Sequence, residues 1–134
     1  MTNFQTCDYV LQYFEYNEEG KAIDKNGKER EVSYIVMELC KHSLFDLIES
    51  QISFTEEAAH YIFTELLKGV REIHSTGHYH WDIKLENILL TDDFEIKIID
   101  FGFCTNETYS FGEKFGTANY NCREYFWRQE LLNE

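Results

Sequence analysis

Two short apolar runs in the second half of the sequence constrain the fold of this chain most strongly. The first is Ile88-Leu89-Leu90 and the second is Ile96-Lys97-Ile98-Ile99, and each has the length of a short strand. The segment between them begins Thr91-Asp92-Asp93, which is typical of a turn. The sequence therefore predicts a small antiparallel hairpin over residues 88–99.

Polar side chains flank this hairpin on both sides. Asp82, Lys84 and Asn87 precede its first strand, and Asp100 follows its second strand directly. The start of the first strand and the end of the second strand lie side by side in an antiparallel pair. We therefore expect these four side chains to converge at one end of the hairpin.

The four residue types match the requirements of phosphoryl transfer. That reaction needs metal ions to neutralise phosphates, a group that accepts the proton of the attacking hydroxyl, and a cation near the developing charge. The carboxylate of Asp100 and the amide oxygen of Asn87 are the hard ligands that Mg²⁺ prefers. Asp82 is left as the proton acceptor, and Lys84 is placed to stabilise the transferring phosphate.

Two other interpretations of the residues around this hairpin stay open. Asp82 and Asp100 can each cap a loop, as most isolated aspartates do. A zinc site is the second alternative, and its candidate ligands are His74, His78, His80 and Cys104. The four cysteines show no C-x-x-C spacing, so neither a zinc ribbon nor a redox pair is predicted.

Two helices are predicted upstream of the hairpin. Ser43 is expected to cap a short helix that runs to about residue 50. A long amphipathic helix is expected to start near Ser53 or Thr55 and to stop at Gly77. Its apolar residues recur on one helical face, and they are Ala59, Ile62, Phe63, Leu66, Leu67, Val70 and Ile73. This helix is expected to pack along the core.

The first 40 residues read as two strands. Residues 9–16 and 32–39 are rich in aromatic and β-branched side chains, which favour strands. Residues 17–31 between them are polar and contain Gly20 and Asn26-Gly27, so they are predicted to form the turn of a long antiparallel hairpin.

Charge and hydropathy restrict the partners of the chain. Lys and Arg number 12 against 25 Asp and Glu, which gives a net charge of -13 and repels phosphate backbones and anionic membrane surfaces. No apolar stretch approaches the roughly 20 residues needed to cross a bilayer, and residues 1–8 lack the features of a secretory signal. We expect a soluble cytoplasmic protein, with a nuclear address also compatible, and neither nucleic acid nor a membrane as a partner.

Four sequence motifs, in order, resemble those of eukaryotic protein kinases. Residues 80–87 (His-Trp-Asp-Ile-Lys-Leu-Glu-Asn) resemble the H-R-D-L-K-P-E-N catalytic loop, and residues 100–102 resemble D-F-G. Residues 116–124 resemble the G-T-x-x-Y and A-P-E that close the activation segment. Residues 34–39 resemble the strand that leads into the hinge. These signals have the separations of the family and cover nearly the whole chain.

The resemblance implies an α+β fold of the protein-kinase type, present in part. Residues 1–39 would be a remnant of the small lobe, with its last strands. Residues 40–134 would follow the hinge and start the large lobe, with its first helices, the catalytic loop and the activation segment. No glycine-rich phosphate loop precedes Asp8, so we expect a portion of a longer product that is inactive by itself. Exposed apolar surface is expected on the long hairpin and the long helix.

The resemblance also implies a site for ATP and Mg²⁺. Backbone groups of Glu38 and Cys40 would meet the adenine, Met37 would guard the back of its pocket, and Leu89 would lie beneath the base. Asn87 and Asp100 would hold the metal. His80 would be a packed residue of the catalytic loop that stacks near Phe101.

Two further motif residues suggest the substrate class. Lys84 and Thr117 are similar to the pattern of serine/threonine kinases, so the substrate is expected to be a Ser or Thr hydroxyl of a protein. The sequence as a whole is most similar to the calcium/calmodulin-dependent type.

Several positions depart from the family pattern. Trp81 replaces an Arg that commonly pairs with a phosphorylated activation loop, Leu85 replaces a Pro, and Cys122-Arg123 replaces Ala-Pro before Glu124. These departures motivate a second hypothesis, in which the chain is a noncatalytic, pseudokinase-like module that binds a partner kinase or a substrate.

Overall fold

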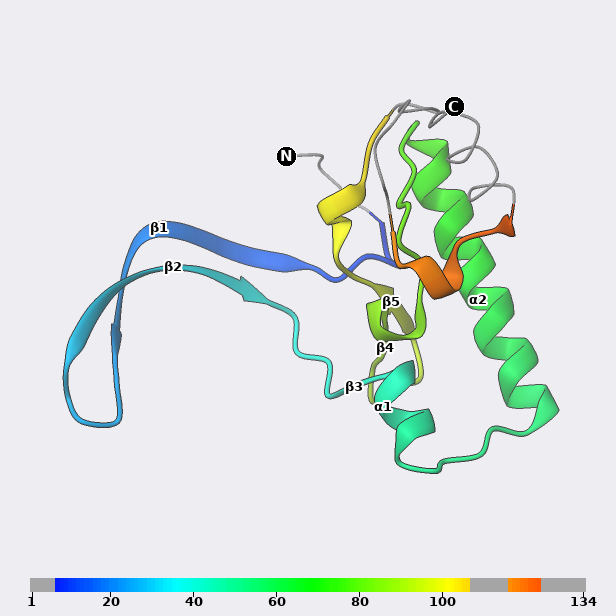
Figure 1. Ribbon diagram of the computed structural model, residues 1–134, viewed down its shortest axis with the longest axis horizontal. Helices are drawn as coiled ribbons and strands as arrows, with labels where there is room; N and C mark the ends of the chain where they lie inside the picture. Colours follow the sequence, from blue (N-terminus) through cyan, green and yellow to red (C-terminus); the bar gives the residue numbers. More distant parts are fainter. Residues whose placement is uncertain (1–6, 107–115, 124–134) are drawn as a thin grey trace, which may run out of the picture.

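The computed structural model describes residues 7–106 and 116–123 (Figure 1). Strands and helices both contribute to it, as an α+β fold requires. In chain order the elements are β1 (Tyr13–Ile23), β2 (Glu29–Met37), β3 (His42–Ser43), α1 (Leu44–Glu49), α2 (Glu56–Ser75), the 3-10 turn η1 (Leu85–Asn87), β4 (Ile88–Leu90), β5 (Ile96–Ile98), and the 3-10 turns η2 (Phe101–Phe103) and η3 (Ala118–Tyr120).

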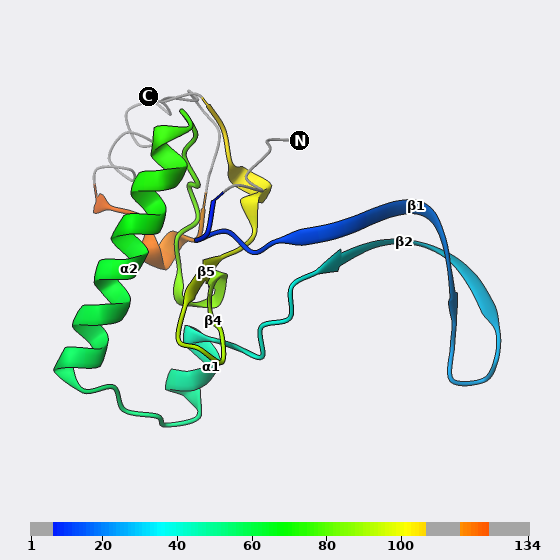
Figure 2. The same ribbon diagram turned by 180° about the vertical axis from the view of Figure 1, so that it is seen from behind.

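Strands β1 and β2 form a long antiparallel hairpin that extends away from the helices and the second sheet (Figures 1 and 2). Its turn is much shorter than the predicted 17–31, because the strands pair as far as Ile23 and Glu29. The carboxylate of Asp24 accepts hydrogen bonds from the amides of Asn26 and Lys28, at 2.8 and 3.1 Å. Gly27 has a positive φ of 80°, which a glycine adopts at little cost. A five-residue turn at 24–28 therefore reverses the chain, and a register shift between Asn17 and Gly20 absorbs the polar residues within the strands.

The predicted start of the first strand, at residue 9, is wrong. Tyr9 and Val10 pair instead with β5, where the amide of Ile98 donates to the carbonyl of Tyr9 at 2.7 Å and the amide of Leu11 donates to the carbonyl of Ile98 at 3.3 Å. Val10 is buried there against the core. Burial of one such side chain stabilises the fold by roughly 1.5–3 kcal/mol, which pairing within the exposed hairpin would not supply.

The hairpin predicted at 88–99 is confirmed as β4 and β5. Ile88 pairs with Ile98, and Leu89 pairs with Lys97. The turn between the strands is closed by Thr91, whose amide and hydroxyl both bond to Glu95 at 3.0 Å. Strand β3 adds to the outer edge of β4 and makes a three-stranded sheet. The sequence did not predict β3, because two residues are too short to show an alternating pattern.

Both helices begin where the sequence predicts. The hydroxyl of Ser43 accepts from the amide of Asp46 at 3.0 Å, and the Asp46 carboxylate accepts from the amide of Ser43 at 2.9 Å, so the two residues form a capping box. The hydroxyl of Thr55 caps α2 by accepting from the amide of Ala58 at 3.2 Å. Helix α2 ends at Ser75, just before Gly77, whose φ is 77°.

A small core lies between α2, α1 and the three-stranded sheet. Its buried apolar residues are Cys7, Val10, Leu44, Ile73, Ile88, Ile96 and Ile98. Part of the apolar face predicted for α2 packs against this core, through Ile62, Leu66 and Val70. Phe63 and Leu67 are exposed instead, because they lie beside the stripe that meets the sheet.

Exposed apolar side chains lie where they were expected, on the β1–β2 hairpin and on α2. Besides Phe63 and Leu67 on α2, they include Phe14 and Ile23 on β1; Leu39 after β2 and Phe94 in the β4–β5 turn are also exposed. No helix within residues 7–106 and 116–123 is long and apolar enough to cross a membrane.

Gly69 sets how closely α2 approaches the rest of the core. A Cβ at this position would lie 2.8 Å from the Cβ of Tyr9 and 3.1 Å from the Cδ1 of Ile98. We expect Gly69→Ala to lower the free energy of unfolding by about 1–3 kcal/mol, because overpacking outweighs the better helix propensity of alanine. Denaturant unfolding measures this change. His60→Ala, on the exposed face of the same helix, should leave stability nearly unchanged, and a Gly69→Ala variant as stable as the wild type would contradict this packing.

Candidate active site

The loop between α2 and β4 carries most of the predicted site residues, and both of its ends are fixed by backbone hydrogen bonds. At its start, Tyr79 and Thr105 exchange two bonds of 2.8 and 3.1 Å. At its end, the amide of Asn87 donates to the carbonyl of Lys84 at 3.0 Å, and the carbonyl of Asn87 accepts from the amide of Ile99 at 3.0 Å. The loop is therefore held between the end of α2 and the β4–β5 hairpin.

Asp82, Lys84 and Thr117 form a closed triangle of contacts. The Nζ of Lys84 lies 2.8 Å from the Oδ2 of Asp82 and donates to the hydroxyl of Thr117 at 2.9 Å. That hydroxyl donates in turn to the Oδ1 of Asp82 at 2.7 Å. The side chain of Asp82 is 2% exposed and that of Lys84 is 19% exposed. A buried carboxylate and a partly buried ammonium group therefore neutralise each other, with Thr117 bridging them.

These contacts set the charge state of the pair. Burial alone would raise the pKa of Asp82, but the hydrogen bonds from Lys84 and Thr117 outweigh it, and the pKa falls below its ordinary 3.8. The hydrogen bond to Asp82 raises the pKa of Lys84 above its ordinary 10.5. Both groups are therefore ionised at neutral pH.

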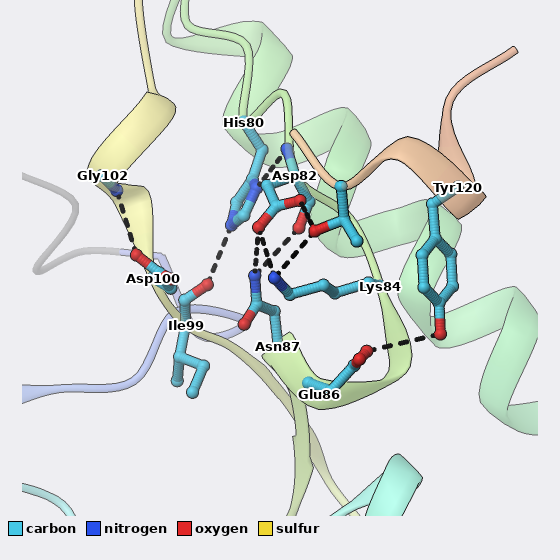
Figure 3. A network of polar contacts seen from close by, with 10 residues as sticks. His80, Asp82, Lys84, Glu86, Asn87, Ile99, Asp100, Gly102 and Tyr120 are labelled. Atoms are coloured by element: carbon cyan, nitrogen blue, oxygen red, sulfur yellow. Dashed lines mark hydrogen bonds and ion pairs between the residues drawn. The ribbon is translucent and has the colours of Figure 1, made fainter. Parts of the chain in front are cut away.

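Asn87 is the third residue in direct contact with Asp82. Its amide nitrogen donates to the backbone carbonyl of Asp82 at 2.9 Å and to its Oδ2 at 3.2 Å. These two bonds fix the orientation of the buried amide, and in Figure 3 its oxygen is turned away from Asp82, to the side of Ile99. The oxygen therefore lies on the side where Asp100 leaves β5.

Asp100 does not join this contact network. It directly follows Ile99, its side chain is exposed, and its Oδ1 accepts from the amide of Gly102 at 3.3 Å. Figure 3 shows its carboxylate directed at Gly102 and away from Lys84. Its backbone is left-handed, with a φ of 62°. The structure thus brings three of the four predicted side chains into contact, and leaves the fourth nearby as the cap of its own turn.

The ring of His80 links the backbone of this loop to the end of β5. Its Nδ1 accepts from the amide of Asp82 at 3.2 Å, so the proton lies on Nε2, which donates to the carbonyl of Ile99 at 2.9 Å. Its ring lies 4.8 Å from that of Phe101, as the family resemblance implied. Both ring nitrogens are therefore used in placing Asp82 beside β5. The zinc alternative gains no support, because the described part of the chain contains no group of three or more His, Cys, Asp or Glu side chains placed to hold a metal.

Gly116 allows the segment with Thr117 to approach the loop. Its φ is 72°, and a Cβ at this position would overlap the carbonyl oxygen of Trp81. Trp81 itself has a φ of 65°, an uncommon value for a bulky residue. The Gly-Thr dipeptide was visible in the sequence as a family motif, but the close approach that places Thr117 on Asp82 was not predicted.

The residues predicted to bind adenine lie at the base of the β1–β2 hairpin and on β4. Met37 is the last residue of β2 and is exposed, and Cys40 is half-buried. Glu38 is bonded to the residue just before β1, since its amide donates to the carbonyl of Gln12 at 2.8 Å. Leu89 is the central residue of β4 and is paired with Lys97.

The end of the family motif is only partly described. Glu124, the last residue of that motif, lies outside the described residues. Within them, the hydroxyl of Tyr120 donates to the carboxylate of Glu86 at 3.3 Å (Figure 3). This bond joins the segment after Thr117 to the loop before β4.

Comparison with known proteins gives one family and several relatives. The family model described as "Protein kinase domain" matches residues 1–132. Serine/threonine-protein kinase PLK1 of Xenopus laevis is 39% identical over 92 residues, which cover 65% of this chain and 15% of that protein. Serine/threonine-protein kinase CHK1 of Mycosarcoma maydis is 43% identical over 82 residues, which cover 60% of this chain and 12% of that protein.

A third relative gives a similar coverage. Maternal embryonic leucine zipper kinase of Xenopus laevis is 42% identical over 72 residues, which cover 53% of this chain and 11% of that protein. The chain thus spans less than a sixth of the length of these relatives. None of the three names mentions calcium or calmodulin, so the predicted similarity to that type stays a prediction.

The burial of His80 generates a pH-dependent stability. Burial lowers the pKa of His80 below its ordinary 6.5, although the bond to Ile99 acts in the opposite direction. The unfolded chain therefore takes up a proton near pH 6.5 while the folded chain resists it. The contribution of His80 is complete above that pH and is lost as the pH falls toward the folded pKa. We expect the free energy of unfolding to fall between about pH 7.5 and about pH 5.5, by at most about 1.4 kcal/mol per pH unit from this group.

A pair of variants separates His80 from the other histidines. His80→Gln should weaken this pH dependence, whereas His60→Gln, at an exposed position of α2, should retain it. Denaturant unfolding at the two pH values measures the difference. An unchanged pH dependence in His80→Gln would show that another group is responsible.

Proposed function

The chain belongs to the protein kinase domain family, and we propose on that premise that it carries out ATP-dependent phosphoryl transfer to Ser or Thr hydroxyls of proteins. The contact triangle of Asp82, Lys84 and Thr117 is the observation that carries this proposal. It combines a buried ionised carboxylate with a partly buried cation at the end of the β4–β5 hairpin. The serine/threonine-protein kinases among its relatives support the same class of reaction.

Asp82 orients the attacking hydroxyl in this mechanism and accepts its proton. A carboxylate has about four acceptor positions, and Lys84, Thr117 and Asn87 occupy three of them. We assign the remaining acceptor position, on Oδ1, to the substrate hydroxyl. The low pKa of Asp82 keeps the carboxylate ionised and ready to accept a hydrogen bond.

Lys84 stabilises the charge of the transferring phosphate in the same proposal. Its ammonium group is already neutralised by Asp82 and keeps a partly exposed side chain. As Asp82 takes up the proton of the hydroxyl, the positive charge of Lys84 becomes available to the phosphate oxygens. Thr117 holds both groups in place through this change, because its hydroxyl accepts from one and donates to the other.

Asn87 and Asp100 are the proposed metal ligands, and their chemistry fits Mg²⁺. Both offer hard oxygen donors, and the exposed Asp100 leaves room for the water and phosphate ligands that this ion keeps. Mg²⁺ would neutralise the phosphate oxygens of the nucleotide. The Asp100 carboxylate would leave the amide of Gly102 to bind it, a single bond of 3.3 Å.

The adenine site of the proposal uses the base of the hairpin. Backbone groups of Glu38 and Cys40 meet the edge of the base, Met37 borders it, and Leu89 lies beneath it. Residues 1–39 are then the part of the small lobe in this chain, and residues 40–134 are the part of the large lobe.

Asp82→Asn in the protein at its natural length tests the role of this carboxylate. The change removes the charge while keeping the shape, so we expect kcat for peptide phosphorylation to fall by about 10²–10⁴. Asp92→Asn, at an exposed position of the β4–β5 turn, is the matched control and should leave kcat unchanged. Equal activity of Asp82→Asn and wild type would refute the proposed role.

A noncatalytic interaction module is the second candidate, and the orientation of Asp100 favours it. Its carboxylate caps the turn at Gly102 and does not contact Asn87 in the described residues. Calorimetric titration with Mg²⁺-ATP distinguishes the two candidates. The kinase proposal expects saturable binding that Asp100→Asn weakens at least tenfold. Absence of any nucleotide binding would favour the interaction module.

A further inference from the structure

Lys97 is a buried charged residue that the proposed mechanism does not use. It is the middle residue of β5, and its side chain is 10% exposed, compared with 19% for Lys84 and 58% for Lys41. A buried ammonium group is costly unless polar partners replace its water. Lys97 must therefore be stabilised by the groups around its Nζ.

Three segments of the chain meet at this ammonium group. Its Nζ donates to the backbone carbonyl of Asp8 at 2.8 Å. It also lies 3.7 Å from a carboxylate oxygen of Glu95 and 3.9 Å from one of Glu38. Lys97 thus links β5 to the segment before β1 and to the segment after β2.

Lys97 lies on the same face of the sheet as Leu89, the residue proposed to lie beneath the adenine base. Lys97 and Leu89 are cross-strand partners, and partners in an antiparallel pair share one face of the sheet. Ile88 and Ile98 form the neighbouring pair, lie on the opposite face, and are buried in the core. Lys97 therefore lies beside Leu89, the residue proposed to lie beneath the base.

Glu38 connects Lys97 to the other side of that site. The amide of Glu38 donates to the carbonyl of Gln12 at 2.8 Å, and its carboxylate accepts from the amide of Gln12 at 3.4 Å. The same carboxylate oxygen is the one that faces Lys97. This charged contact of 3.9 Å joins the residue after β2 to β5, in addition to the backbone bonds of Tyr9 and Leu11 to Ile98 on the other side of the hairpin base. The hairpin extends away from the core beyond this point (Figure 2).

We propose that Lys97 is a positioning residue for nucleotide recognition, which fixes the backbone of residues 38–40 relative to Leu89 by holding the carboxylate of Glu38. This inference rests on the proposed function, because it assumes that residues 38–40 meet the base. A segment held in its binding conformation loses less freedom when the ligand arrives, and the affinity rises accordingly. Lys97 acts in this way on the binding of the base and not on phosphoryl transfer.

Binding of adenosine, ATP and GTP, measured by calorimetry on the protein at its natural length, tests this role. Adenosine has no phosphate, so it reports the base site without Asp100 or Lys84. Lys97→Met should raise the Kd of adenosine and of Mg²⁺-ATP by roughly tenfold. Adenine carries an amino donor where guanine carries a carbonyl acceptor, so the loss should fall on ATP more than on GTP and reduce the discrimination between them. Lys97→Arg should retain most of the affinity.

Two further variants keep the test decisive. Glu38→Gln removes the charged contact but leaves the bond from Lys97 to Asp8, so it should weaken adenosine binding in the same direction even if Lys97→Met does not fold. Lys41→Met is the matched control. It removes an exposed lysine next to Cys40 that pairs with Asp92, and it should leave the Kd of adenosine unchanged.

The possible results separate this inference from the proposed function. Adenosine affinity that stays at the wild-type value in Glu38→Gln and in folded Lys97→Met overturns the positioning role alone. An equal loss for ATP and GTP also overturns it, because it indicates a general structural effect. A wild-type protein that binds none of the three ligands overturns the proposed function together with the inference.

Discussion

The buried carboxylate of Asp82 is the constraint on which the rest of the site depends. A carboxylate with 2% of its side chain exposed is stable as an ion only if donors replace the lost water. Those donors come from separate parts of the sequence, namely Lys84 and Asn87 in the same loop and Thr117 more than 30 residues later. Satisfying this one charge therefore fixes the loop before β4 and draws residues 116–121 onto it. Gly116 permits the approach because it has no Cβ.

Lys97 presents the same physical problem with the opposite charge. Its ammonium group donates to the carbonyl of Asp8 and is paired with the carboxylates of Glu38 and Glu95. These contacts of Lys97 bring Asp8 and the base of the β1–β2 hairpin to the face of the sheet that carries Leu89. Two buried charges of opposite sign thus organise the two sides of the proposed nucleotide site. The small apolar core supports both of them through Ile88 and Ile98.

The sequence predicted the parts of this fold that depend on local patterns. The caps of both helices, the β4–β5 hairpin and the contact of Asp82 with Lys84 and Asn87 follow from short segments and their spacing. The turn at 24–28 was missed because the register shift near Gly20 hides the strand pattern. The pairing of Val10 with Ile98 and the hydrogen bond of Lys97 to Asp8 were missed because both join segments almost 90 residues apart. The orientation of Asp100 depends on one local bond to Gly102, which spacing alone does not reveal.

The central claim is that Asp82 receives the hydroxyl of a Ser or Thr substrate while Asn87 and Asp100 hold the metal of the nucleotide. A crystal structure of the protein at its natural length with Mg²⁺, a nonhydrolysable ATP analogue and a substrate peptide tests this claim most directly. We predict a peptide hydroxyl within hydrogen-bonding distance of the Asp82 carboxylate, and a metal ion bound by Asn87 and by an Asp100 side chain that has turned away from Gly102. A peptide hydroxyl bound elsewhere, or a nucleotide held without these residues, would contradict the account.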